Sequence, residues 1–254
     1  MTSWTAVVTG GAKGIGFAIS DLLASEGWNV VITGRDEAAL KVAVTTLSES
    51  NPDVTIVGKT MDVQNLASIT STFANVEAQF GSLEALVNCA GIVIRENMET
   101  VSDDTWLTVI NTNLTGAFRC SKAALPLLKA ATNGSSIVNI SSIAGSLGIA
   151  GRTSYTASKA GLEGLTRTLA LELAEFGIRV NGVAPGWTRT EMVDRGINEG
   201  KIDLDTVASR IALKRFADPE EIANVVSFMI SDAASYVTGQ TLLVDGGITI
   251  NGNT

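Results

Sequence analysis

The chain has 254 residues, of which 45% are hydrophobic and 17% charged, and its formal net charge is −8. A chain of this length can bury a sizeable core in one α/β domain. The acidic balance repels a phosphate backbone and an anionic membrane surface, so we expect neither nucleic acid nor a membrane as a partner.

Histidine is absent from the sequence. This excludes Ser-His-Asp and Cys-His catalysis and His-containing zinc sites. The two cysteines, Cys89 and Cys120, lie in apolar runs and cannot alone build a thiolate metal site, so we expect reduced thiols and no metal. Proton transfer must then use Tyr, Lys, Ser, Asp or Glu. No secretory signal pattern and no run of about 18 apolar residues is visible, which predicts a cytoplasmic location.

Short β-branched runs alternate along the chain with longer helical patterns. Strands are predicted at 6–9, 30–33, 54–57, 83–88, 137–140, 178–180 and 241–244. Helices are predicted at 16–26, 37–49, 65–79, 103–130, 154–176 and 219–231. Strands separated by such helices form right-handed βαβ units, and near-continuous Val/Ile runs indicate strands covered on both faces. The sequence therefore predicts a single doubly wound α/β domain over residues 1–254.

The segment 187–213 interrupts this alternation. Gly196, Gly200 and several charged residues break up its pattern. We interpret it as a mobile substrate flap, and the alternative is a solvated surface excursion.

A glycine-rich loop joins the first predicted strand to the first predicted helix and reads Thr9-Gly10-Gly11-Ala12-Lys13-Gly14-Ile15-Gly16. Its glycines allow a tight turn and let the backbone approach a pyrophosphate, whose charge the helix N-terminus stabilises. The position between strand and helix of a βαβ unit distinguishes the motif from a plain turn. We predict that the loop binds a dinucleotide through Gly10, Lys13, Gly14, Ile15 and Gly16.

The end of the second predicted strand bears on the choice of cofactor. An acid there would bond the ribose 2′-hydroxyl of NAD, but Gly34 occupies that place and Arg35 follows it. Together with Lys13, Arg35 favours the 2′-phosphate of NADP, because a guanidinium can form bidentate hydrogen bonds with phosphate oxygens. Asp36 could instead pair with Arg35 or reach the ribose. NADP(H) is therefore the favoured cofactor, and NAD(H) remains possible.

Tyr155 and Lys159 are four residues apart in a predicted helix and so share one face. A nearby ammonium favours the phenolate form of a tyrosine, which makes the pair an acid/base unit. The alternative is two surface residues, one of them covering an apolar patch.

Three further predicted strands end in polar or turn residues. These are Asn88-Cys89-Ala90-Gly91, Ser141-Ser142 and Pro185-Gly186. Because the ligand crevice of an open α/β sheet lies at the carboxyl ends of its strands, we expect these groups to meet the glycine loop there.

Taken together, these residues resemble the short-chain dehydrogenase/reductase family, of the kind similar to 3-oxoacyl reductases, over essentially the whole chain. Besides the glycine loop, the matching residues are Asp62-Val63, Asn88-Cys89-Ala90-Gly91, Asn113, Ser142, Tyr155-x3-Lys159, Pro185-Gly186 with Thr190, and Asp245-Gly246-Gly247. Ser142 precedes Tyr155 by thirteen residues, the family's common spacing, which selects it over Ser141. Cys89 departs from the family, where Asn is more usual, and we expect little consequence.

The resemblance implies a Rossmann fold with a seven-stranded parallel sheet and an ordered catalytic set. Tyr155 would be the general acid in carbonyl reduction and the base in alcohol oxidation. Lys159 would hold the nicotinamide ribose hydroxyls and favour the phenolate of Tyr155. Ser142 would bond the carbonyl oxygen, where negative charge develops. Asn113 would position a water that relays protons to Lys159.

The resemblance also implies the rest of the cofactor site. Asp62 and Val63 would contact the adenine, and Asn88, Ala90 and Gly91 would line the ribose side. Thr188 and Thr190, which follow Pro185 and Gly186, would meet the carboxamide. Family members are commonly tetramers joined through the helices predicted at 103–130 and 154–176 and through the last strand, so a homotetramer is expected.

The leading expectation is an NADP(H)-dependent reductase of a ketone or aldehyde, or the reverse secondary-alcohol dehydrogenase. The alternatives are a 3-oxoacyl-thioester reductase of fatty-acid type and a non-catalytic nucleotide-binding scaffold. An acidic carrier protein would favour a basic patch, yet the chain is acidic and has Glu175-Phe176 where carrier-using relatives tend to be basic; Lys129 is a weak counterexample. We therefore favour a small, fairly apolar substrate. The expected pocket lining is Trp187, Met192, Val193, Ile143, Leu147, Ile92 and Ile94, with Arg95 or Arg152 at the rim.

Overall fold

The computed structural model describes residues 4–200 and 202–251, without the side chain of Met192, so the pocket role expected for Met192 lies outside the described part. Within those ranges seven parallel strands form one sheet in the order β3-β2-β1-β4-β5-β6-β7. The strands are β1 (Thr5–Thr9), β2 (Asn29–Gly34), β3 (Ile56–Thr60), β4 (Ala85–Asn88), β5 (Ser135–Ile140), β6 (Ile178–Pro185) and β7 (Thr241–Val244). The order reverses between β1 and β4, which opens a ligand crevice at their carboxyl ends. The predicted seven-stranded parallel sheet is confirmed.

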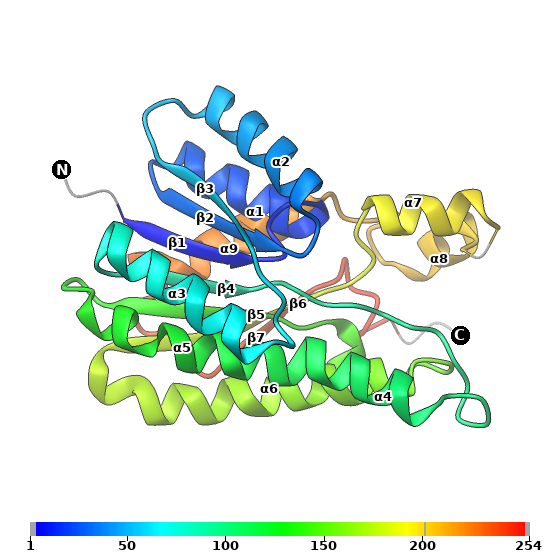
Figure 1. The fold of residues 1–254 in the computed structure, drawn as a ribbon. Helices are drawn as coiled ribbons and strands as arrows, with labels where there is room; N and C mark the ends of the chain where they lie inside the picture. Colours follow the sequence, from blue (N-terminus) through cyan, green and yellow to red (C-terminus); the bar gives the residue numbers. More distant parts are fainter. Residues whose placement is uncertain (1–3, 201, 252–254) are drawn as a thin grey trace.

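Helices cover both faces of the sheet (Figure 1). On one face lie α1 (Gly14–Ser25), α2 (Glu37–Ser50) and α9 (Pro219–Ile230). On the other lie α3 (Leu66–Phe80), α5 (Gly116–Ala130) and α6 (Thr153–Leu173), with α4 (Asp103–Ile110) packed on α6. Each layer closes over its own apolar core.

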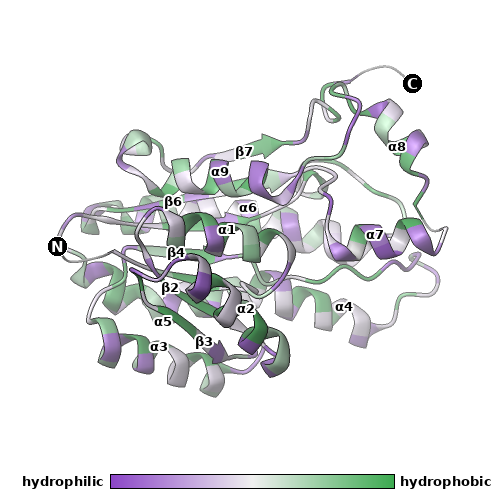
Figure 2. Ribbon diagram, turned by 90° about the horizontal axis from the view of Figure 1, so that it is seen from above, coloured by the Kyte–Doolittle hydropathy of each residue, from purple (hydrophilic) through white to green (hydrophobic). Residues whose placement is uncertain are grey.

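The central strand β1 contributes to both cores. Ala6 and Val8 belong to the core under α1 and α9, whereas Val7 belongs to the core under α3 and α5. Successive side chains of a strand point to opposite faces, so a strand that is apolar at every position is buried from both sides. In Figure 2 hydrophobic residues are concentrated in the strands, and hydrophilic ones lie along outer helices such as α3 and α7.

Several predicted boundaries differ from the structure: the strand expected at 178–180 extends to Pro185, and the one expected at 83–88 begins at Ala85. Two further differences have identifiable reasons. The strand expected at 54–57 begins instead at Ile56, because the Val54 N–H bonds back to Asn51 and Val54 belongs to the turn after α2. It continues through the less apolar Gly58-Lys59-Thr60, which an edge strand tolerates because one side of it is solvated. The helix expected over 103–130 is interrupted by a π-helical turn at Asn111–Thr115.

The segment 187–213 contains two short helices beyond the carboxyl ends of the strands, α7 (Glu191–Asn198) and α8 (Leu204–Arg210) (Figure 1). Ile202, Ile211 and Phe216 form a small core beneath them, and the Trp187 ring lies 5.5 Å from that of Phe216. The segment is therefore folded on its own core; its mobility stays a prediction. Across the described ranges no helix combines the length and apolarity that a bilayer span requires.

Candidate active site

The glycine loop is pressed against the end of β4. The Gly10 N–H donates to the Thr33 carbonyl (2.8 Å), and the Thr9 hydroxyl oxygen accepts from the N–H groups of Cys89 and Ala90 (3.0 Å each). Gly10 has φ +70°, and a Cβ there would lie 3.0 Å from the Ala90 Cα. Only glycine fits this approach without strain. These contacts place the ends of β1 and β4 side by side.

The last glycine of the loop, Gly16, is equally constrained. A Cβ on Gly16 would lie 2.2 Å from the Gly10 carbonyl oxygen, which is far inside van der Waals contact. A Cβ on Gly14 would lie 3.4 Å from the Thr190 methyl carbon, so the segment after β6 reaches the glycine loop. Thr190 also caps α7, because its hydroxyl accepts from the Val193 N–H (3.4 Å). The structure thus brings Thr190 beside the glycine loop.

A cleft of about 150 Å³ opens where the ends of β1, β2 and β4 meet. It gathers six residues of the expected cofactor set, namely Gly10, Arg35, Asp62, Val63, Ala90 and Gly91. The cleft is also lined by Ile92, which was expected in the substrate pocket, and by Met61 and Thr112, which the sequence reasoning did not single out. Met61 directly precedes Asp62 and Thr112 directly precedes Asn113, so both adjoin residues that the sequence did indicate.

Three charged residues, Lys13, Arg35 and Asp36, lie beside the glycine loop, and the sequence did not determine which of them pair. Asp36 binds Lys13 (Nζ to Oδ2, 3.3 Å) rather than Arg35, and both side chains are largely exposed. Asp36 also caps α2 by accepting from the Ala39 N–H (3.0 Å). This backbone bond, and then the bond from Lys13, lower the pKa of Asp36 from its ordinary value. Within the described ranges Arg35 forms no ion pair, so it is the cation left for a 2′-phosphate.

Tyr155 and Lys159 share one face of α6 at the carboxyl end of β5. The Lys159 ammonium lies 5.7 Å from the centre of the Tyr155 ring. It donates to the Ile140 carbonyl (2.7 Å) and its residue is 5% exposed. A Cβ on Gly91 would lie 3.6 Å from this ammonium, so the cation lies directly under the backbone after β4. The alternative of two exposed surface residues is therefore wrong.

Asn113 lies in the π turn Asn111–Thr115 and is buried. Its amide forms a paired contact with one peptide group: Oδ1 accepts from the Ile92 N–H and Nδ2 donates to the Ile92 carbonyl, both at 2.9 Å. Nδ2 also donates to the Ser158 hydroxyl (3.0 Å), one residue before Lys159. Single π turns are frequent at functional sites, and this one turns the amide toward the loop after β4.

The two serines after β5 have different surroundings. The buried Ser141 hydroxyl donates to Glu163 Oε1 (3.0 Å). Ser142 is half-buried, and its hydroxyl accepts from the Ala144 N–H (3.2 Å), which leaves its proton available to a ligand. This geometry agrees with the choice of Ser142 from its spacing to Tyr155.

Asn88 does not face the cleft. Its side chain is buried and donates to Ser121 (3.0 Å) and Asn139 (2.9 Å), so it ties β4 to its neighbours. Burial raises the pKa of the adjoining Cys89 thiol to about 11, although the charge of Lys159 opposes the shift. Burial likewise raises the pKa of Cys120 to about 12, and both thiols are free. Neither is suited to act as a nucleophile near neutral pH.

The turn after β6 rests on the end of β7. The Gly186 N–H donates to the Val244 carbonyl (2.9 Å), and a Cβ on Gly186 would lie 2.7 Å from the Asp245 Cα. Asp245 in turn accepts from the N–H groups of Gly247 and Thr249. Thr188 is buried beside this turn. The Asp245-Gly246-Gly247 motif therefore supports the Pro185-Gly186 turn at the site.

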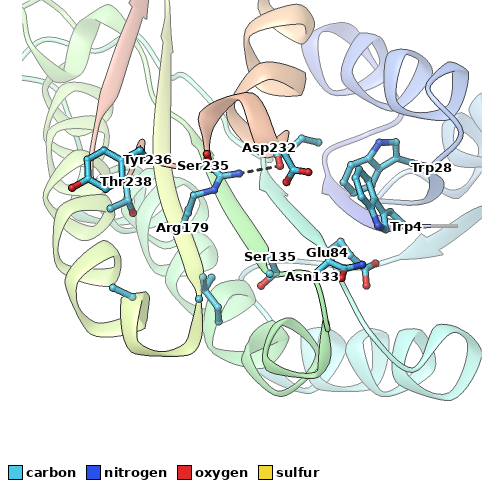
Figure 3. A pocket seen from close by; sticks show the side chains of 15 residues that line it. Trp4, Trp28, Glu84, Asn133, Ser135, Arg179, Asp232, Ser235, Tyr236 and Thr238 are labelled. Atoms are coloured by element: carbon cyan, nitrogen blue, oxygen red, sulfur yellow. Dashed lines mark hydrogen bonds between the residues drawn. The ribbon is translucent and has the colours of Figure 1, made fainter. Parts of the chain in front are cut away.

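A larger hollow of about 650 Å³ lies at the opposite edge of the sheet (Figure 3). Three of its lining residues directly precede strands: Trp4 comes before β1, Trp28 before β2 and Glu84 before β4. Arg179 beside it is bonded to main-chain carbonyls at the end of α9, among them that of Ile230 (3.0 Å). No residue of the catalytic set lines this hollow. Because ligands of open α/β sheets bind at the carboxyl ends, the smaller cleft is the candidate functional site.

Comparison with known proteins agrees with this architecture. Residues 10–249 match the family model described as enoyl-(acyl carrier protein) reductase. The chain is 37% identical over 243 residues to the 3-oxoacyl-(acyl-carrier-protein) reductase FabG of Vibrio harveyi, with 96% of each chain covered. It is 39% identical over 246 residues to FabG of Staphylococcus aureus (strain N315), with 96% of this chain and 97% of the relative covered.

A solved structure of a single-residue variant of actinorhodin polyketide ketoreductase with NADPH superposes with a TM-score of 0.90 at 35% identity, covering 97% of each chain. The chain belongs to the short-chain dehydrogenase/reductase family. It is an NAD(P)-dependent reductase of that family, homologous to FabG.

Proposed function

We propose that the protein is an NADP(H)-dependent oxidoreductase that interconverts a ketone or aldehyde with the corresponding alcohol, with Tyr155 as general acid and base. The observation that carries the proposal is the position of Tyr155 beside the buried ammonium of Lys159, at the same sheet edge as the glycine loop. In a chain without histidine, this pair is the acid/base unit that the site contains.

The residues at the cleft fit a nicotinamide dinucleotide. Gly10 and Gly16 leave room where a side chain would collide with backbone, and the N-terminus of α1 points to the same place. We propose that the glycine loop holds the pyrophosphate, Asp62 and Val63 the adenine, and the segment from Pro185 to Thr190 the carboxamide. The bound dinucleotide supplies or accepts the hydride.

The catalytic side chains act on the carbonyl oxygen. The hydroxyls of Ser142 and Tyr155 donate to this oxygen and stabilise the negative charge that develops as the carbon is reduced. Tyr155 then gives its proton to the oxygen, and the alcohol leaves with both new hydrogens. The Lys159 ammonium, fixed by the Ile140 carbonyl, stabilises the phenolate that remains.

Asn113 acts as a positioning residue. Its amide fixes the Ile92 peptide and the Ser158 hydroxyl, and both lie next to Lys159. A Cβ placed on Gly91 would lie 3.4 Å from Asn113 Oδ1 and 3.6 Å from the Lys159 ammonium. We propose that a water held beside these two groups returns a proton to Tyr155 through Lys159.

The test is Tyr155→Phe, which removes the transferable proton and keeps the ring. We expect kcat for carbonyl reduction to fall about 10²- to 10⁴-fold while NADPH affinity stays unchanged, as measured by stopped-flow absorbance and by fluorescence titration. The matched control is Tyr236→Phe, since Tyr236 is the other tyrosine of the chain and lines the hollow at the amino edge. Full activity in Tyr155→Phe would refute the assignment.

The names of the FabG relatives raise a second candidate, the reduction of 3-oxoacyl groups on a carrier protein. Docking an acidic carrier calls for free cations near the cleft. The Lys129 ammonium, noted above as a candidate, lies 3.2 Å from the centre of the Phe176 ring and is already engaged. We therefore favour a small carbonyl or alcohol substrate. The homotetramer and the cytoplasmic location remain predictions.

A further inference from the structure

Arg152 immediately precedes α6, three residues before Tyr155. Its side chain is half-buried, and its guanidinium carbon lies 5.5 Å from the centre of the Trp187 ring. Within the described ranges this guanidinium donates to no side chain or carbonyl and joins no ion pair. It is thus a cation at the reaction site whose hydrogen-bonding edges are unused.

The surroundings of Arg152 are electropositive. Burial and then the neighbouring charge of Arg95 lower the pKa of Arg152, while Tyr155 acts in the opposite direction. The nearest acid along the adjoining strand-like segment is Glu96, which meets Arg152 only through a backbone bridge. A partly desolvated cation next to a like charge is unfavourable unless an anion completes the site.

The start of α6 strengthens this field. It has no side-chain cap and no acidic residue in its first turn. In contrast α2, α4, α7, α8 and α9 each carry an acidic residue in their first turn, the usual complement to a helix N-terminus. The positive end of this 21-residue helix and the Arg152 guanidinium therefore lie together at the start of α6, close to Tyr155.

We propose that Arg152, stacked near Trp187, binds an anionic group of the substrate, so that the enzyme acts on a small oxo acid and its hydroxy-acid partner. This inference rests on the proposed function, because Tyr155 places the reacting carbonyl. A guanidinium that lies against an aromatic ring keeps its N–H edges free to form a bidentate hydrogen bond with an oxyanion. Arg152 is the N-cap of α6 and Tyr155 is the third residue of that helix, so both side chains start from the same end of α6, and Tyr155 is among the groups that influence the pKa of Arg152.

This subsite separates the two candidate substrates. In a 3-oxoacyl thioester the atoms next to the reacting carbonyl are neutral, so Arg152 would stay unpaired. In a free 3-oxo acid the carboxylate lies two carbons from the carbonyl and can reach Arg152. The proposal differs from the expectation of a fairly apolar substrate, because that expectation treated Arg152 only as a rim residue.

The kinetic test compares acetoacetate with its neutral isostere acetoacetamide, using NADPH and the whole enzyme. We expect kcat/KM to be at least about tenfold higher for the acid, and Arg152→Gln to reduce the acid-to-amide ratio at least about tenfold. Arg152→Lys keeps the charge but cannot form the bidentate hydrogen bond, so it should give an intermediate acid-to-amide ratio of kcat/KM. Arg167→Gln is the matched control, because Arg167 is exposed on the same helix and should leave the ratio unchanged. Parallel assays with 2-oxopropane-1-sulfonate and hydroxyacetone phosphate compare kcat/KM for a sulfonate and a phosphate with that for the carboxylate.

A binding test makes the outcome independent of turnover. We expect butyrate to bind the enzyme–NADP⁺ complex more tightly than butyramide in calorimetric titration, and Arg152→Gln to remove the difference. Equal kcat/KM for acid and amide, or equal binding of butyrate and butyramide, would overturn the anion subsite while leaving carbonyl reduction intact. Absence of turnover with every carbonyl would instead count against the proposed function, and the butyrate titration would still decide the role of Arg152.

Discussion

Asp36 partly neutralises the positive charge beside the glycine loop, because it pairs with Lys13. Its bonds to Lys13 and to the Ala39 N–H keep one carboxylate charge close to the position of the cofactor ribose. Lys13 is therefore partly neutralised, although the sequence suggested two cations for a 2′-phosphate. Arg35, which lines the cleft and has no ion pair in the described ranges, carries the argument for NADP(H) almost alone.

We predict that Arg35→Ala lowers kcat/KM for NADPH about 10- to 100-fold and leaves that for NADH nearly unchanged, because a charge-assisted bond to phosphate is lost. Lys13→Ala should have a smaller effect, since Asp36 already pairs with Lys13. Steady-state kinetics with both cofactors and one carbonyl substrate measure this. An Arg35→Ala enzyme that keeps its preference for NADPH would contradict the assignment.

The positions of some functional residues could be predicted from the sequence, and those of others could not. Tyr155 and Lys159 could be predicted because helical spacing alone puts them on one face. Asn88 was expected to line the ribose side, yet its side chain turns inward to Ser121 and Asn139. Both faces of β4 are buried, so nothing in the local pattern indicates which way its last side chain points.

Among the helices, α9 has the most complete N-terminus. Pro219 opens it, and Asp218 and Glu221 form a capping box. Arg215 adds two bonds to the Glu221 carboxylate, at 2.6 and 2.7 Å. The bond from Arg215, and then the Asp218 N–H, lower the pKa of Glu221 to about 2.

We predict that Glu221→Gln lowers the free energy of unfolding at pH 7 by about 1 kcal/mol, the usual contribution of a helix cap. A carboxyl whose folded pKa is depressed stabilises the fold above its unfolded pKa and loses that contribution as pH falls. The difference between wild type and variant should therefore shrink from about pH 4.5 toward pH 2. Urea unfolding at pH 7, 5 and 3 measures it. Glu220→Gln, on the exposed neighbour, should change stability less, and a difference that grows toward acid pH would contradict the assignment.

The elements that the sequence misplaced share a cause. Hydrophobic periodicity predicts the alternation of strands and helices, and the seven predicted strands are all present in the sheet. The π turn around Asn113 depends on bonds to Ile92 and Ser158, which are distant in sequence, and no periodicity encodes them. The helices of 187–213 likewise depend on a small core with Phe216 that only the folded chain assembles.

At the scale of the molecule, two groups of exposed apolar side chains among the described residues are candidates for contacts between chains. One lies over the edge strand β7 and helix α9, where Leu242 is 43% exposed and Phe228 42%. The other lies on α4 and α5, where Leu107 is 51% exposed and Phe118 44%. These helices cover opposite faces of the sheet (Figure 1). If each patch paired with its own copy on another chain, the two contacts together would build a closed tetramer with two kinds of interface, as expected from the sequence.

This arrangement predicts stepwise dissociation. Leu242→Glu should break the contact through β7 and leave dimers joined through α5, because a charge on a packed edge strand opposes pairing. Phe118→Glu should break the other contact and also leave dimers, while the double variant should be monomeric. Light scattering coupled to size exclusion at micromolar concentration distinguishes the three masses. Val42→Glu is the control, since Val42 is exposed on α2 beside the opposite edge of the sheet and should leave the tetramer intact. A wild-type protein that elutes as a monomer would show that neither patch is an interface.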